Sequence, residues 1–178
     1  MRLFVAVDVN GEVRRRIEEI IQDLAQAGAD VGWSPPEKLH FTLKFLGDAD
    51  VKVVERLVKD AAKRIAPFRI TLAGLGYFGS PRFVRVVWAG VSEGRQEMIN
   101  AMEAMNTALN DVRKEEAPPR PHLTIGRPRG ERNTENLLEK VAKHNGMKIG
   151  EVDVNQMVLK NSAAGHYEDL AVFPLEGA

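Results

Sequence analysis

Two short segments of the sequence carry the same pair of reactive side chains, a histidine followed two positions later by a threonine. His40 and Thr42 lie in Leu-His-Phe-Thr-Leu, and His122 and Thr124 lie in Pro-His-Leu-Thr-Ile. In an extended strand, side chains two positions apart point to the same face. Each segment is therefore expected to present an imidazole and a hydroxyl on one face and apolar side chains on the other.

Two imidazoles that line a common cleft are suited to acid–base chemistry. Because the unperturbed pKa of imidazole is about 6.5, one histidine can act as a neutral base while the other acts as a protonated acid. Phosphodiester cleavage needs this pairing: the base takes a proton from the attacking water or hydroxyl, and the acid protonates the departing ribose oxygen. The hydroxyls of Thr42 and Thr124 can hold the non-bridging oxygens. This scheme requires no metal and no cofactor.

Basic residues near the two motifs are candidates for phosphate contact. Around the second motif lie Arg120, Arg127, Arg129 and Arg132, and guanidinium groups suit phosphate through bidentate geometry. Strict alternation places Arg127 on the face opposite His122, so a bulge or strand exit at Gly126 would be needed to turn it toward the site. The same alternation places Lys44 on the His40 face, as a second candidate for phosphate binding.

Composition excludes several other kinds of chemistry. The chain has 178 residues, equal numbers of basic and acidic side chains (25 of each) and no cysteine, which removes disulfide frameworks, thiolate zinc sites and cysteine nucleophiles. A net charge of zero argues against a protein that coats long nucleic acid, although a local basic patch is compatible with it. No apolar run approaches the roughly 20 residues of a membrane span. We expect a cytoplasmic protein, and the many charges with few glutamines favour a thermophilic source.

Periodicity predicts four amphipathic helices. They begin after Asn10, at the cap formed by residues 48–50, near Ser92 and at Thr134, and the third is expected to be the longest, reaching Val112. Eight strand-like segments lie between them, at residues 3–9, 39–45, 68–75, 83–88, 122–125, 147–154, 156–161 and 167–173. Residues 74–81 are predicted to form a loop. This alternation indicates an α/β or α+β protein with sheet in both halves.

The spacing of the two motifs indicates an internal duplication. They stand nearly half the chain apart, and each follows a helix, a proline-containing loop and a basic residue, Lys38 or Arg120. Two lobes related by an approximate twofold axis would bring both polar strand faces into one cleft.

At these residues the sequence resembles the 2H phosphoesterase superfamily, and within it the RNA 2′,3′-cyclic phosphodiesterases, also called 2′-5′ RNA ligases. Residues 1–8 look like the family's first strand, residues 38–47 and 120–127 are similar to its two motifs, and residues 78–82 and 86–90 look like the segment between its halves. The resemblance implies a bilobal α+β fold with two antiparallel sheets about a pseudo-twofold axis and a central cleft carrying both motifs. We expect a single domain over residues 1–178, with the lobes exchanging near residues 89–92, and a monomer.

The resemblance also implies a reaction. His40 and His122 would be catalytic, and Thr42 and Thr124 would bind phosphate. A terminal 2′,3′-cyclic phosphate of RNA would open to a 2′-phosphate, with His40 giving a proton to O3′ and His122 taking one from water. Spacing alone does not assign these two roles, because the motifs are nearly symmetric. If the 5′-hydroxyl of another RNA, such as a tRNA fragment, replaces water, the same site forms a 2′-5′ linkage.

Three alternatives remain open at this point. The same chemistry could act on a small cyclic nucleotide, or the cleft could bind nucleotide or tRNA without turnover. The histidines could instead ligate a metal, although no cysteine and no carboxylate spacing accompanies them. Turnover of mononucleotides against oligonucleotides, and sensitivity to chelators, separate these alternatives from the main prediction.

Overall fold

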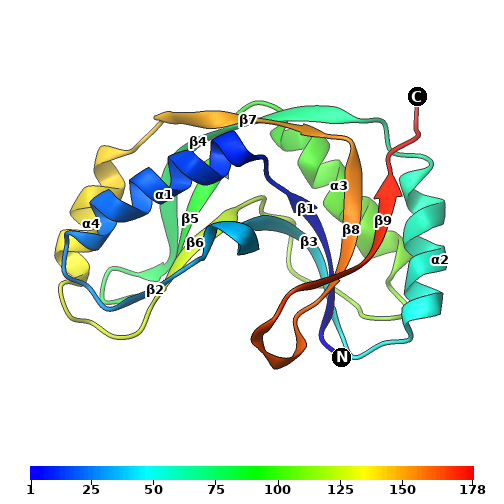
Figure 1. Cartoon of the computed structure of the whole chain (residues 1–178), viewed down its shortest axis with the longest axis horizontal. Helices are drawn as coiled ribbons and strands as arrows, with labels where there is room; N and C mark the ends of the chain where they lie inside the picture. The colour runs from blue at the N-terminus through cyan, green and yellow to red at the C-terminus, as the bar shows by residue number, and fades with distance from the viewer.

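Nine strands and four α-helices make up the computed structural model, which describes residues 1–178 (Figure 1). The helices are α1 (Gly11–Ala25), α2 (Val51–Ala62), α3 (Arg95–Ala108) and α4 (Thr134–Lys143). The strands are β1 (Leu3–Asp8), β2 (Val31–Trp33), β3 (His40–Gly47), β4 (Phe68–Ser80), β5 (Phe83–Val91), β6 (Leu123–Pro128), β7 (Lys148–Val154), β8 (Gln156–Asn161) and β9 (Glu168–Pro174). The α+β class is confirmed.

All the strands belong to one antiparallel sheet. Its order is β7-β4-β5-β6-β3-β1-β8-β9, with β2 paired to β6. The prediction of two separate sheets is wrong, because β3 and β6 pair at one position, Phe41 with Leu123, and so join the two halves at the centre. Strand pairing elsewhere in the sheet extends over several residues, so this central joint is its narrowest connection.

The helices pack in two pairs at opposite ends of the sheet (Figure 1). Helices α1 and α4 contact each other and the strands β7 and β4, whereas α2 and α3 contact each other and the strands β3, β8 and β9. Each pair covers an apolar face; in α1 the buried side chains are Val13, Ile17, Ile20 and Leu24. No helix has the length and apolar character needed to cross a membrane.

The predicted helix starts are confirmed at α1, α2 and α4. The side chain of Asn10 accepts a hydrogen bond from the Val13 amide at 2.9 Å, and Asp50 caps α2 in the same way through the Val53 amide. Helix α3 is shorter than predicted. Its C-cap residue Leu109 leaves helical geometry, and the chain continues in turns through the turn-forming pair 110–111. Helix α1, with 15 residues, is therefore longer than α3, with 14.

Two strand predictions also differ from the structure. Strand β4 continues through residues 74–80, where the sequence predicts a loop. Gly74 and Gly79 fall at register shifts opposite β5, whereas Gly76 pairs regularly with Trp88. Gly79 adopts a positive φ of 107° at one of these shifts. Glycine-rich sequence here marks a bulged hairpin strand. Strand β2 is absent from the predicted elements, since three residues carry too little periodicity to be recognised.

Candidate active site

The single β3–β6 pair sets the two His-x-Thr motifs beside each other. Phe41 lies across from Leu123 in the antiparallel register, and both side chains are buried. One position outward in either direction, each histidine falls across from the threonine of the other motif. All four polar side chains share the sheet face opposite the Phe41 side chain. Burial is the main cause that lowers the pKa of His40, and the charge of the nearby His122 adds to it slightly.

Both imidazoles are oriented by the same backbone contact. The Nδ1 atom of His40 donates to the carbonyl of Lys38 at 2.7 Å, and Nδ1 of His122 donates to the carbonyl of Arg120 at 2.6 Å. A carbonyl oxygen only accepts, so Nδ1 must carry the hydrogen in each ring. In the neutral form of each ring, Nε2 is then the nitrogen that can accept a hydrogen bond. In His40 it lies 3.0 Å from the hydroxyl oxygen of Thr42.

Aromatic side chains hold each imidazole in place. The ring of His40 lies 5.0 Å from that of Phe4 and 5.4 Å from that of Tyr167, measured between centroids. The ring of Phe78 meets His122 edge-on at 4.9 Å. Sequence reasoning did not identify these three aromatic residues as parts of the site. They come from β1, the β8–β9 loop and β4, and only the folded sheet brings them to the histidines.

Burial lowers the pKa of both histidines below the ordinary value of 6.5. In each ring the hydrogen bond to a backbone carbonyl opposes this effect. For His40, the charge of Lys160 lowers the pKa further and that of Asp8 raises it; the two groups form an ion pair at 3.1 Å. For His122, the guanidinium of Arg127 lowers the pKa. Both imidazoles therefore favour the neutral form.

A bulge in β3 decides where Lys44 points. The register against β1 skips Leu43, so the strict alternation of side chains breaks there. The side chain of Lys44 turns to the core side toward α3, where it is 2% exposed and its Nζ has no hydrogen-bond partner. Burial lowers its pKa. The prediction that Lys44 lies on the His40 face is therefore wrong, and Phe45 takes that face and contacts Phe4.

A matching bulge in β6 has the opposite consequence for Arg127. The register against β5 skips Ile125, one position before the glycine at which the sequence predicts a bulge. Gly126 then takes the buried face, where a Cβ would lie 2.6 Å from the Trp33 ring. Arg127 returns to the site face, close enough to His122 to lower its pKa. Arg129, by contrast, pairs with Asp30 at 3.1 Å, outside the motif strands.

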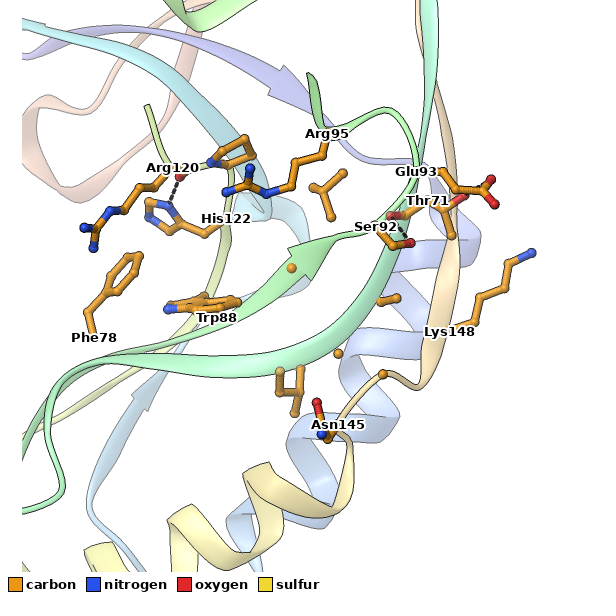
Figure 2. A pocket seen from close by; sticks show the side chains of 17 residues that line it. Thr71, Phe78, Trp88, Ser92, Glu93, Arg95, Arg120, His122, Asn145 and Lys148 are labelled. Carbon is orange, nitrogen blue, oxygen red and sulfur yellow. Dashed lines mark hydrogen bonds between the residues drawn. The ribbon is translucent and has the colours of Figure 1, made fainter. Parts of the chain in front are cut away.

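Two cavities flank His122. One, of about 750 Å³, extends across β5, β4 and β7, and Figure 2 shows the side chains that line it, among them Trp88, Arg95 and Arg120. The other, of about 530 Å³, lies where β3 and the segment before β6 separate. It is lined by Thr42, Lys44 and His122 together with residues of α3. His122 therefore lies between two cavities, each large enough for part of a nucleotide.

The other two histidines lie outside this site. His144 is mostly buried at the end of α4, where its Nε2 contacts Asp23 of α1 at 3.1 Å. That contact and Lys140 lower the pKa of Asp23. His166 is exposed. No three His, Cys, Asp or Glu side chains cluster closely enough to hold a metal ion.

The chain is similar to known proteins over almost its entire length. It is 35% identical to an RNA 2′,3′-cyclic phosphodiesterase of Methanothermobacter thermautotrophicus, covering 98% of this chain and 99% of the relative. It is 33% identical to a protein of the same name from Archaeoglobus fulgidus, covering 97% and 99%. Among solved structures, TT0787 of Thermus thermophilus superposes with a TM-score of 0.80 at 27% identity, covering 99% of both chains. Escherichia coli LigT, solved with ATP, shares the fold with a TM-score of 0.72.

A family model gives the assignment. Residues 3–163 match the model of the 2′-5′ RNA ligase superfamily, a span that contains both His-x-Thr motifs and the β3–β6 joint. The chain therefore belongs to the 2′-5′ RNA ligase superfamily of 2H phosphoesterases.

Proposed function

We propose that the chain hydrolyses the terminal 2′,3′-cyclic phosphate of RNA to a 2′-phosphate, using His40 and His122 without a metal. The observation that carries this proposal is the matched orientation of the imidazoles: each Nδ1 is held by a backbone carbonyl, which leaves Nε2 for proton transfer. Full-length relatives named RNA 2′,3′-cyclic phosphodiesterase support the same substrate class.

The proposed step balances its protons between the two rings. Nε2 of His122 takes a proton from water as the water oxygen bonds to phosphorus, and the bond from phosphorus to O3′ breaks. Nε2 of His40, protonated beforehand, gives its proton to O3′. The hydroxyls of Thr42 and Thr124 and the guanidinium of Arg127 hold the non-bridging oxygens. Solvent then restores both rings by removing one proton and supplying the other.

The surrounding charges support this division of roles. Arg127 lowers the pKa of His122, and no carboxylate opposes this effect. A lowered pKa keeps the ring neutral, as a base requires. Around His40 the effects of Lys160 and Asp8 oppose each other. An anionic phosphate beside His40 favours its protonated form. The same phosphate would also raise the pKa of His122, and the guanidinium of Arg127 would oppose that rise.

Ligation is proposed to share the site. A 5′-hydroxyl of a second RNA in place of water gives a 2′-5′ linkage, with O3′ leaving as before. Water at about 55 M competes with a dilute RNA end, so hydrolysis dominates unless the second strand is bound and oriented.

Lys44, in the cavity beside Thr42, is proposed as a phosphate contact from the core side.

The two motif strands are proposed to be halves of a pseudo-twofold arrangement within one domain. The support is local: both strands carry a bulge at the third residue after the histidine, and both histidines bond to the carbonyl two residues earlier. In a bilobal cleft of this kind, the two imidazoles would lie on either side of one phosphate.

A small cyclic nucleotide is the second candidate substrate, because the histidines themselves would contact only the reacting phosphate.

Product analysis tests the proposed reaction. An RNA ending in a 2′,3′-cyclic phosphate is incubated with the protein in the presence of a chelator, and the product is identified as a 2′- or a 3′-phosphate. We expect the 2′-phosphate. A 3′-phosphate would overturn the assignment of O3′ as the leaving group, and loss of turnover with the chelator would overturn metal independence.

A further inference from the structure

The larger cavity beside His122 continues away from the reacting centre. It reaches from His122 on the β6 side to Lys148 on β7, so it spans four neighbouring strands. Strands lie about 4.8 Å apart, so this floor is roughly 14 Å wide. That is more room than the phosphate and its ribose require, and the proposed reaction uses only the end at His122.

An indole ring forms the floor of this cavity. Trp88 lies across from Thr124, and its ring extends over Gly76 of β4, where a Cβ would overlap the ring atoms. Only glycine at position 76 lets the ring lie flat there. A second glycine, Gly90, clears the other side, with a Cβ position 3.3 Å from the ring. Figure 2 shows the ring between the strands beneath it and the side chains of His122 and Arg95 above it.

The indole also carries an unused donor. Trp88 Nε1 is buried and has no hydrogen-bond partner. Because Nε1 is buried, its hydrogen-bonding edge is not open to a ligand, and the flat face of the indole is the part that the cavity offers. Nucleobases supply a flat face that stacks on aromatic rings.

A free cation stands over the same cavity. Arg95 is the first residue of α3, a position at which the helix dipole disfavours positive charge. None of the ion pairs in the structure includes Arg95. Figure 2 shows its side chain reaching across the cavity in the direction of His122. Lys148, at the far end, is already paired with Glu151 at 3.0 Å. Arg120, beside His122, also lines the cavity and is in no ion pair, so Arg95 is the unpaired cation on the side of the cavity away from the motif.

We infer that this cavity binds the nucleotide preceding the one that carries the cyclic phosphate, with its base on Trp88 and the linking phosphate at Arg95. This inference rests on the proposed function and narrows its substrate class from small cyclic nucleotides to the 3′ ends of oligonucleotides. Arg95 and Trp88 are specificity residues in this arrangement, and they take no part in proton transfer.

Three substrates separate the contribution of the linking phosphate from that of the preceding nucleoside. They are a nucleoside 2′,3′-cyclic phosphate, the same compound with a 5′-phosphate, and a dinucleotide ending in the cyclic phosphate. For the unmodified protein we expect kcat/KM to rise at each addition. Arg95→Gln should remove the gain from the 5′-phosphate. Trp88→Leu should lower kcat/KM for the dinucleotide by about tenfold or more, the usual effect of losing one stacked base. Neither variant should change turnover of the plain nucleoside compound by more than about twofold.

Fluorescence gives a readout that does not depend on activity. The chain has two tryptophans, so a Trp33→Phe variant reports on Trp88 alone. Adding the dinucleotide 2′-phosphate should quench that signal, whereas adding the mononucleotide 2′-phosphate should not. Arg56→Gln, an equivalent charge change on the exposed side of α2, serves as the control and should behave as the unmodified protein.

The outcomes distinguish this inference from the proposed function. If the unmodified protein turns over all three substrates equally, or if both variants slow the plain nucleoside compound as much as the dinucleotide, the second-nucleotide site is wrong while the phosphodiesterase proposal stands. If none of the three substrates is turned over, the proposed function itself is wrong.

Discussion

Phe41 and Leu123 form the one paired position between β3 and β6, and they hold the two halves of the sheet together directly beneath the histidines. Both side chains are buried, at 1% and 0% exposure. The strand pairing that aligns one motif with the other is thus limited to this single position.

Shortening a buried side chain at this joint should lower both the stability and the activity of the protein. Leu123→Ala removes a fully buried side chain and should lower the free energy of unfolding by about 2–5 kcal/mol. Because the cavity opens under the motif, kcat should also fall in the protein that remains folded. Urea denaturation gives the first quantity and turnover at low temperature the second. Val172→Ala, at a side chain 51% exposed, is the control and should change little. Unchanged stability in Leu123→Ala would show that the joint is not held by packing.

Removing Arg127 should raise the pKa of His122. The guanidinium lowers that pKa in the folded protein, so Arg127→Gln relieves the effect and moves it upward. Titration of the histidine ring protons by NMR measures the change directly. If Arg127 also contacts the substrate phosphate as proposed, KM for the cyclic phosphate should rise at the same time. Arg129→Gln is the matched control, because Arg129 pairs with Asp30. An equal pKa change in both variants would contradict a specific Arg127–His122 interaction.

The buried histidines should make stability depend on pH. The pKa of each histidine is lower in the folded chain than in the unfolded chain. As the pH falls below about 6.5, the unfolded chain therefore binds more protons than the folded chain does. The free energy of unfolding is therefore highest above this value and decreases as the pH falls through the lowered pKa values. A His40→Gln, His122→Gln double variant should lose part of this decrease between pH 7 and 5. Thermal melting at several pH values checks it, and identical slopes for both proteins would contradict it.

Replacement of two buried lysines by methionine should change the stability of the protein in opposite directions. Lys44 has no partner for its ammonium, so Lys44→Met removes a desolvation cost and should stabilise the protein by about 1 kcal/mol or more. Lys160, which is 6% exposed, contacts Asp8 and Asp169 at 3.1 and 2.6 Å, so Lys160→Met should destabilise it. Chemical denaturation measures both. If Lys44 also contacts substrate phosphate as proposed, Lys44→Met should raise KM; unchanged KM would limit its role to the core.

Local patterns in the sequence were sufficient to predict much of this structure. Caps and apolar periodicity identified three helix starts, and alternation identified eight strands and the shared face of each His-x-Thr pair. Alternation failed at Lys44, because a bulge is determined by pairing with a distant strand and leaves no local signal. The aromatic partners of the histidines, and the joining of two half-sheets into one, depend on the same long-range pairing. At Arg127 the neighbouring Gly126 indicated that a bulge or strand exit was possible, and the bulge lies one residue earlier, at Ile125.

The paired action of the two histidines is tested most directly by turnover of an RNA 2′,3′-cyclic phosphate by His40→Ala, His122→Ala and the double variant, in the presence of chelator. Each single variant should lose on the order of 10²–10⁴-fold in kcat, the range typical of a lost general acid or base. The double variant should be little slower than the worse single variant, because the two rings act as a unit. Full turnover in either single variant would contradict the proposed mechanism.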